Sequence, residues 1–179
     1  ALKKGCEVVG IKRGYNGLIN GDMVELTERS VSDIIQRGGT MLYTARCVEF
    51  KEEAGLQKAK KTCLDNNISG IVTIGGDGSF RGAKIISEIG FQTIAIPATI
   101  DNDIGCTDFS IGFDTAVNTV LDAMNKIRDT AFSHNRVYVV EVMGKTSGFI
   151  AVAAGLTGGA EAILIPEISF NLDEICRQL

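Results

Sequence analysis

The chain has 179 residues, 45% of them hydrophobic and 22% charged, and its formal net charge is −4. This length allows a hydrophobic core. No apolar run reaches the roughly 20 residues that cross a bilayer, so a membrane is not an expected partner. The basic residues form no block, so nucleic acid is not expected either. The five cysteines include no C-x-x-C pair or histidine cluster, which indicates free thiols in a cytoplasmic protein without a structural metal.

Short β-branched runs alternate with segments of helical period along the whole chain. The opening residues ALKKG are typical of the last turn of a helix, because Lys3 and Lys4 suit its carbonyl end and Gly5 can take a left-handed cap. Near the other end, Asn171 and Glu174 are spaced like a capping pair that opens a helix. We therefore expect a piece of a longer protein. Strands are predicted near 7–12, 40–44, 70–75, 92–97, 136–142 and 161–165, and helices near 30–37, 52–67, 79–89, 113–131, 146–157 and 171–179.

The apolar patterns predict the fold class. The strand segments GIVTIG, RVYVVEV and AILIP are mostly apolar without strict alternation, as expected when helices cover both faces of a parallel sheet. The segment 113–131 predicts an amphipathic helix whose apolar face carries Phe113, Val117, Val120, Leu121, Met124 and Ile127. The sequence therefore predicts an α/β fold with a doubly wound, mostly parallel sheet and helices on both faces.

A glycine-rich turn, IGGDGSF at 74–80, follows an apolar strand. Gly75, Gly76 and Gly78 lack Cβ atoms where the strand gives way to a helix, so the N–H groups that open the helix at Ser79 can approach a bulky anion. A tight turn whose glycines only relieve backbone strain is the alternative. Asp77 favours a ligand, because a carboxylate beside a phosphate is repulsive unless a cation lies between them.

An acidic loop, PATIDNDIGCTD at 97–108, follows the next strand. Asp101 and Asp103 flank Asn102 at the carboxyl edge of the sheet, where open α/β sheets bind ligands. An Asx-rich turn is the alternative explanation. Taken together, the two loops supply the requirements of phosphoryl transfer: a backbone anion cradle, Asp77 and Asp103 as Mg²⁺ ligands bound directly or through water, and Asp101 as a candidate base.

A third stretch, MGKTSGFIA at 143–151, again runs from a strand end to a helix start. Lys145 either contacts a phosphate or decorates a solvated helix start, and the residues alone favour the second. His134, the only histidine, is interpreted as a helix-end residue. A packing role for Cys47 is at least as consistent with the sequence as a reactive one.

Several blocks of the chain closely resemble the 6-phosphofructokinase family: GGDGSFRGA, PATIDNDIGCTDFSIGFDTA, RVYVVEVMGKTSGFIA and GGAEAILIPE, with RSVSDIIQRGGT and TARCVEF similar to its earlier blocks. The glycine-glycine-aspartate turn also occurs in NAD kinases and diacylglycerol kinases, whereas the T-I-D-N-D loop is close to diagnostic. The resemblance implies transfer of the γ-phosphoryl of ATP to the 1-hydroxyl of fructose 6-phosphate, a glycolytic reaction, with Mg²⁺ as cofactor. It implies that 1–179 is a nucleotide-binding domain truncated at both ends, without most of the sugar-phosphate domain and with little kinase activity alone.

The resemblance also implies roles for individual residues. Asp101 corresponds to the catalytic base, Thr99 to a contact of the transferring group, and Asp77 and Asp103 to the Mg²⁺ partners. Arg136 matches an arginine that reaches a neighbouring subunit's substrate, which implies a homo-oligomer, commonly a tetramer. The nucleotide-binding positions are Tyr15, Arg46, Cys47, Gly76, Asp77, Gly78, Ser79 and Gly82. The substrate-binding positions are Thr99, Asp101, Asp103, Arg136, Met143, Gly144 and Lys145.

The phosphoryl donor also follows from the comparison with the family. Pyrophosphate-using relatives usually carry an aspartate at the position of Gly78 and a lysine at that of Ala98, so both positions favour ATP. A pyrophosphate-dependent enzyme and a non-catalytic paralogue that binds nucleotide or sugar phosphate are the alternatives. The D-N-D loop, which keeps both aspartates, disfavours the paralogue.

Three departures from the family pattern concern substrate binding and regulation. Lys145 stands where many members have arginine, which keeps the charge and loses a two-pronged contact. Glu28 and Arg29 occupy a region where bacterial enzymes often carry an effector-binding arginine followed by a tyrosine. Arg128 and Glu161 do match effector-site positions, so allosteric control stays an open alternative.

Overall fold

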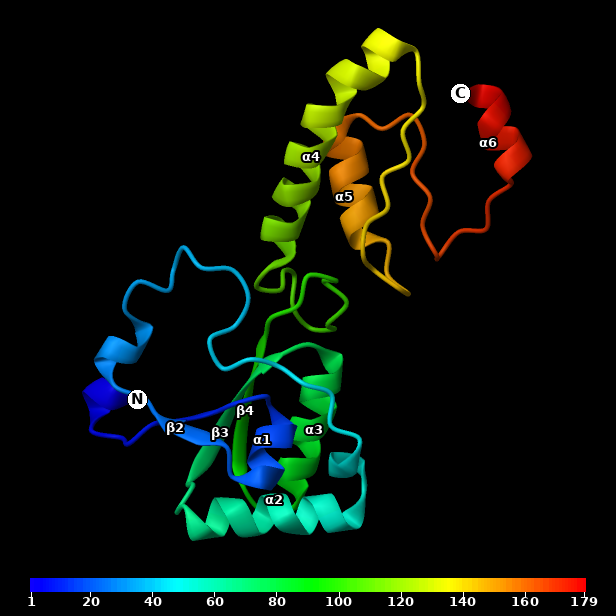
Figure 1. The fold of residues 1–179 in the computed structure, drawn as a ribbon. Coiled ribbons are helices and arrows are strands. Elements are labelled where there is room, and N and C mark those ends of the chain that lie inside the picture. Colours follow the sequence, from blue (N-terminus) through cyan, green and yellow to red (C-terminus); the bar gives the residue numbers. More distant parts are fainter. The chain divides into compact units, whose positions relative to one another are not determined.

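The computed structural model describes residues 1–179, apart from the side chain of Gln178. Two compact units comprise residues 1–72 with 81–94 (unit 1) and residues 73–80 with 95–179 (unit 2). The elements in chain order are η1 (Leu2–Lys4), β1 (Val9–Ile11), α1 (Tyr15–Asn20), β2 (Met23–Glu25), η2 (Glu28–Val31), η3 (Glu49–Lys51), α2 (Glu53–Asp65), β3 (Gly70–Gly75), α3 (Asp77–Glu88), β4 (Gln92–Pro97), α4 (Phe113–His134), α5 (Phe149–Gly158) and α6 (Leu172–Gln178), where η marks a short 3-10 helix (Figure 1).

Unit 1 is built around a small apolar core. Strands β1 and β2 pair in antiparallel register, with Val9 opposite Glu25 and Ile11 opposite Met23. Helices α1 and α2 pack on each other and on η3. The core cluster consists of Leu18, Ile19, Phe50, Ala59, Cys63 and Ile86, and burying these side chains supplies most of the stabilisation available to this unit.

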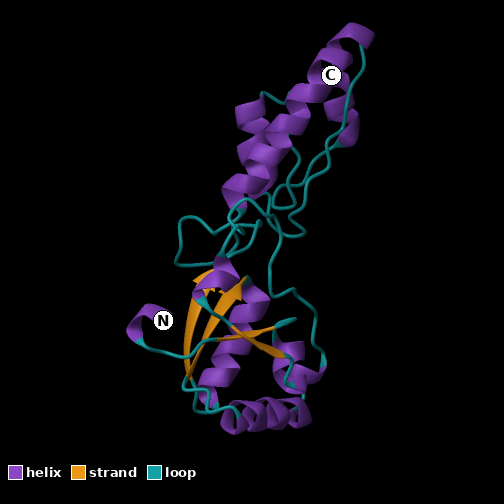
Figure 2. Cartoon of the chain, turned by 60° about the vertical axis from the view of Figure 1, so that its left-hand side comes forward, coloured by secondary structure: helices purple, strands orange, loops and turns teal.

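Strands β3 and β4 form a separate two-stranded sheet, drawn with β1 and β2 in orange in Figure 2. The two strands run parallel, because Gly70 lies against Gln92 at their beginnings and the Ala98 amide donates to the Gly75 carbonyl at their ends (2.9 Å). Their carboxyl ends therefore meet at one edge, which is where the glycine-rich turn and the acidic loop begin. Both strands have the bounds that the sequence predicts.

Unit 2 is held together by the packing of α4 on α5. The predicted apolar face of α4 is confirmed: Phe113 is buried, Val117 and Met124 are half-buried, and Asp122 on the other face is exposed. The Arg128 guanidinium donates to the Gly158 carbonyl at the end of α5, where carbonyl groups lack partners within the helix. The predicted helices 52–67, 79–89, 146–157 and 171–179 are confirmed as α2, α3, α5 and α6, within a few residues at their ends.

The cap predicted at Gly5 is present, as is the Asn171 half of the capping pair predicted near the other end. Gly5 follows η1 in the left-handed conformation, with φ 78°. The Asn171 side chain accepts a hydrogen bond from the Asp173 amide (3.0 Å) and so caps α6. The predicted strand at 7–12 corresponds to β1. In the described part of the chain, no helix is both long and apolar enough to cross a membrane.

Four predicted elements are wrong. The segments 40–44, 136–142 and 161–165 do not form strands, because a strand needs a ladder of hydrogen bonds to a neighbouring strand and none of the three belongs to either described sheet. The Leu42 carbonyl accepts a single hydrogen bond from the Arg13 amide (2.7 Å), which does not continue into a ladder. Val139, in the second of these segments, is 92% exposed. The predicted helix 30–37 reduces to η2, since Asp33 adopts a left-handed φ of 54° and Ile35, at 88% exposure, buries no apolar face.

Candidate functional site

The turn after β3 places a helix N-terminus beside an acidic residue. The Gly76 carbonyl accepts hydrogen bonds from the amides of Ser79 (2.9 Å) and Phe80 (3.1 Å), so α3 begins at Asp77. The first amide groups of a helix point out of its N-terminal end and carry a partial positive charge, which attracts anions. Asp77, Gly78 and Ser79 thus lie in the turn of α3 that an anion would approach.

Three glycines of this region have a packing reason to be glycine. A Cβ at Gly75 would lie 2.5 Å from the Ser79 hydroxyl oxygen, and one at Gly76 would lie 3.4 Å from the Cβ of Thr99. At Gly82 it would collide with the ring of Tyr15. Packing against neighbouring side chains therefore accounts for glycine at these three positions without a ligand.

Packing does not explain why residue 78 is a glycine. Its φ lies outside the left-handed range and the residue is exposed. Apart from its chain neighbours and the backbone of its own helix, no atom lies within 4 Å of the place of a Cβ. Neither backbone strain nor packing explains a glycine in the first turn of α3, where glycine is less favourable than alanine. An open position beside the amide groups of a helix N-terminus is what close approach by a phosphate requires.

The acidic loop after β4 lies directly against this turn. The Ala98 amide donates to the Gly75 carbonyl (2.9 Å), and Thr99 packs against Gly76. Asp77 follows Gly76 by one residue and Asp101 follows Thr99 by two. The structure therefore brings the two loops together at the carboxyl ends of β3 and β4. The side chain of Asp101 is half-buried, whereas those of Asp77 and Asp103 are exposed.

The segment 143–148 approaches the acidic loop from a different part of unit 2. The Ser147 hydroxyl donates to the Asp101 carbonyl (3.2 Å), and Ser147 is only 8% exposed. Gly144 has a φ of 126° and a Cβ there would collide with the Ser147 carbonyl, so only glycine suits this turn. Met143 and Lys145 on either side are exposed, as is Arg136, which follows α4.

Four of the proposed nucleotide positions lie in unit 1. The Tyr15 ring stacks on Phe50 with centroids 4.2 Å apart and planes inclined by 17°, and Gly82 lies against the same Tyr15 ring. Cys47 is half-buried against the core cluster, which supports a packing role, and Arg46 is exposed.

Sequence reasoning missed two residues that shape these loops. Phe50 supports the Tyr15 ring, and the only signal for it was its place at the end of the quoted block TARCVEF. Glu167 accepts a hydrogen bond from the Gly148 amide (2.7 Å) and so places a carboxylate at the N-terminus of α5. The only signal for Glu167 was its place at the end of the block GGAEAILIPE.

The residues at the carboxyl edge of β3 and β4 fit a magnesium ion that arrives with a polyphosphate. Among the side chains that the structure describes, no cluster of three or more acidic, cysteine or histidine groups could enclose a metal. Mg²⁺ is commonly held by one or two carboxylates together with phosphate oxygens and water, so a closed cage is not needed. Asp77 and Asp103 supply two exposed carboxylates on the loops that flank the open Gly78 position.

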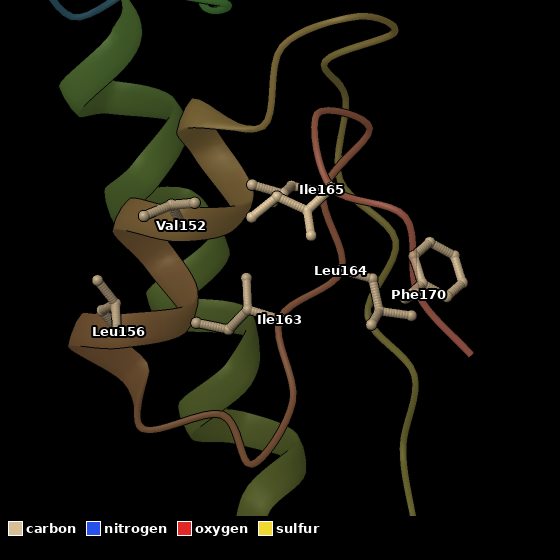
Figure 3. Close-up of a pocket in the computed structure, with 7 residues that line it drawn as sticks. Val152, Leu156, Ile163, Leu164, Ile165 and Phe170 are labelled. Carbon is tan, nitrogen blue, oxygen red and sulfur yellow. The ribbon is translucent and has the colours of Figure 1, made fainter. Parts of the chain in front are cut away.

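A cavity of about 270 Å³ elsewhere in unit 2 does not suit this chemistry. It lies between α5 and the segment 163–170, as Figure 3 shows. Its lining is apolar throughout and consists of Val152, Leu156, Ile163, Leu164, Ile165, Ile168 and Phe170. With no charged or polar side chain in this lining, the cavity is a poor match for a phosphate or a sugar.

Parallel β3 and β4 and their flanking helices define an α/β protein. Its candidate ligand site is the sheet edge where the glycine-rich turn and the acidic loop begin. The chain belongs to the phosphofructokinase family, whose family model matches residues 1–179. The predicted α/β fold class is confirmed, because solved phosphofructokinases share this fold. The phosphofructokinase of Pichia pastoris in the T-state is 35% identical with a TM-score of 0.88, over 99% of this chain and 22% of that one.

Curated relatives are more similar still. An ATP-dependent 6-phosphofructokinase of Halothermothrix orenii is 61% identical over 176 residues, which cover 98% of this chain and 53% of the relative. The protein of the same description from Clostridium botulinum strain Hall is 58% identical over 178 residues, covering 99% of this chain and 56% of the relative. The chain thus spans about half the length of the curated relatives that it matches.

Proposed function

We propose that the chain is the nucleotide-binding part of an ATP-dependent 6-phosphofructokinase, in which the full-length protein transfers the γ-phosphoryl of ATP to the 1-hydroxyl of fructose 6-phosphate. The descriptions of the curated relatives support this activity. The observation in the structure that carries it is Gly78, a helix-opening glycine that faces open space. Most of the sugar-phosphate domain belongs to the remainder of the full-length protein.

In this proposal, the turn after β3 binds the phosphates of ATP. The amide groups at the start of α3 stabilise the negative charge, and the absence of a Cβ at Gly78 allows the phosphates to come close. Asp77 and Asp103 are the residues of this chain that would hold Mg²⁺, which when bound would supply positive charge to offset that of the phosphates. The nucleotide contacts are assigned to Tyr15, Arg46, Cys47, Gly76, Asp77, Gly78, Ser79 and Gly82.

The acidic loop supplies the proton acceptor. The oxygen of the sugar 1-hydroxyl forms a bond to the γ-phosphorus as the bond between that phosphorus and the β,γ-bridging oxygen breaks, and ADP leaves. The hydroxyl proton passes to the Asp101 carboxylate, a contribution typically worth about 10²–10⁴-fold in rate. Thr99 contacts the transferring group. The other sugar-phosphate contacts are assigned to Asp103, Arg136, Met143, Gly144 and Lys145.

Two alternatives concern the donor and the chemistry. Pyrophosphate as donor is disfavoured, because pyrophosphate-using relatives usually carry an aspartate at the position of Gly78 and a lysine at that of Ala98. The missing carboxylate at Gly78 leaves room for the ribose and α-phosphate of ATP. A non-catalytic paralogue is disfavoured because Asp101 and Asp103 are both present. We also propose a cytoplasmic homo-oligomer, commonly a tetramer, in which Arg136 reaches a neighbouring subunit's substrate.

The test replaces Asp101 with serine in the full-length protein and compares it with an Asp129→Ser control on the exposed face of α4. Turnover of fructose 6-phosphate should fall by at least about 10²-fold in Asp101→Ser, with ATP affinity within a few-fold of the unsubstituted protein. The control should keep both. Turnover that survives Asp101→Ser would reject the base. Steady turnover with pyrophosphate in place of ATP, in the same preparation, would instead identify pyrophosphate as the donor.

A further inference from the structure

The loop that joins β4 to α4 is closed by its own side chains. Asn102 adopts a left-handed φ of 53°. Its Oδ1 accepts a hydrogen bond from the Ser110 amide (2.8 Å), and its Nδ2 donates to the Asp108 carbonyl (3.2 Å). The Asn102 side chain therefore links the first part of the loop, which leaves β4, to its returning limb, the part that leads into α4 and contains Asp108 and Ser110.

Ser110 extends this bridge to Thr99. Its hydroxyl oxygen accepts a hydrogen bond from the Thr99 amide (2.7 Å), and Ser110 is only 5% exposed. The Thr99 hydroxyl oxygen in turn accepts from the Asp101 amide (3.3 Å). The backbone of the Thr99–Asp101 turn is therefore fixed from the returning limb, through bonds partly shielded from competing water.

Asp101 is held on its other side as well. Its carbonyl accepts the hydrogen bond from the Ser147 hydroxyl described above. The bonds that reach Asp101 thus use its amide and its carbonyl, and none of them uses its carboxylate. A backbone fixed at both groups limits the directions in which the side chain can point while the carboxylate itself stays available to take up a proton.

We propose that Asn102 and Ser110 are positioning residues, which hold the Thr99–Asp101 turn so that the Asp101 carboxylate meets the acceptor hydroxyl. This inference rests on the function proposed above. Neither side chain touches the reacting atoms in this role. A misplacement of about 1 Å at a reacting group can cost about 10²-fold in rate, so loosening this turn should lower the rate of the chemical step rather than substrate affinity.

Two substitutions separate hydrogen bonding from backbone strain. Asn102→Gly removes both side-chain bonds and keeps a residue that accepts the left-handed φ at no steric cost. Asn67→Gly is the matched control, because Asn67 has the same φ of 53° and lies after α2 in unit 1. Ser110→Ala removes the acceptor of the Thr99 amide, and Ser110→Thr keeps a hydroxyl at that position.

The experiment measures kcat and KM for ATP and fructose 6-phosphate in the full-length protein, together with amide hydrogen exchange at Thr99 in the 179-residue chain. In Asn102→Gly and Ser110→Ala, kcat should fall by roughly 10- to 100-fold, with both KM values within about twofold and an unshifted pH profile, since the base itself is unchanged. The Thr99 amide should exchange faster. Ser110→Thr should recover most of kcat, and Asn67→Gly should match the unsubstituted protein.

The outcomes distinguish this inference from the function on which it rests. Unchanged kcat in Asn102→Gly and Ser110→Ala, in a protein that turns over fructose 6-phosphate and loses turnover in Asp101→Ser, would overturn the positioning role alone. Absence of turnover in the unsubstituted full-length protein would overturn the function and the positioning role together. Equal losses of kcat in Asn67→Gly and Asn102→Gly would attribute the effect to general destabilisation and also overturn the positioning role.

Discussion

Gly78→Ala tests whether the turn after β3 binds phosphate, because it adds a single methyl group there. Gly78→Ala adds a Cβ to the first turn of α3, in open space and with a backbone that alanine tolerates. At such a position the change stabilises a protein by about 0.4–1 kcal/mol, because alanine restricts the unfolded chain. With a urea slope of about 2 kcal/mol/M, the midpoint of unfolding should rise by roughly 0.2–0.5 M.

The same methyl group should hinder ATP. Inserting a methyl group into a closely packed contact typically costs about 1–3 kcal/mol, so the Kd for ATP of the full-length protein should rise by roughly 5- to 150-fold. Urea unfolding of the chain followed by circular dichroism and ATP titration of the full-length protein measure the two effects. Gly82→Ala is the contrasting variant: its Cβ would collide with the Tyr15 ring, and it should lower stability. A stabilised Gly78→Ala protein with unchanged ATP affinity would refute the role of this turn in phosphate binding.

Two further predictions concern Glu167 and Cys63. Glu167→Ala removes the acceptor of the Gly148 amide at the start of α5, so it should lower the free energy of unfolding by about 1–2 kcal/mol in urea titrations. The stability of Glu167→Gln should lie between those of Glu167→Ala and the unsubstituted chain. Equal stability of all three proteins would contradict the capping role. Burial raises the pKa of the Cys63 thiol above its ordinary value of 9.0, so the folded state holds this proton more tightly than the unfolded state. The stability that this provides is complete below the ordinary thiol pKa and is lost as the pH rises toward the folded value, so the unsubstituted chain should lose more stability than Cys63→Ala as the pH rises above that ordinary value. Parallel stability curves for the two proteins would exclude the thiol as the cause.

The elements that could be predicted are those whose signals are local. The strand bounds 70–75 and 92–97 were correct because each apolar run ends at a glycine or a proline. The amphipathic α4 was correct because its apolar period is long. The strands expected at 136–142 and 161–165 failed for a different reason: their apolar composition indicates what they could bury, but a strand also needs a neighbouring strand, which composition does not specify.

The candidate site also contains some contacts that the sequence predicts and others that it does not. The meeting of the turn at Gly76 with the loop at Thr99 could be anticipated, because loops that follow adjacent parallel strands emerge at the same edge. The bond from Ser147 to the Asp101 carbonyl spans 46 residues and the bond from Gly148 to Glu167 spans 19. Serine and glutamate occur throughout soluble proteins, so no spacing rule identifies these particular partners.

The outer face of the β3–β4 pair affects how the purified chain will behave. Val72, Ile74 and Ile94 are 60%, 64% and 67% exposed, and each strand has one hydrogen-bonded neighbour among the described residues. Apolar side chains next to unpaired strand edges promote association between copies of a chain. Light scattering from the 179-residue polypeptide should therefore increase with concentration and with ammonium sulfate, so dilute samples at low ionic strength are preferable for the exchange and unfolding measurements.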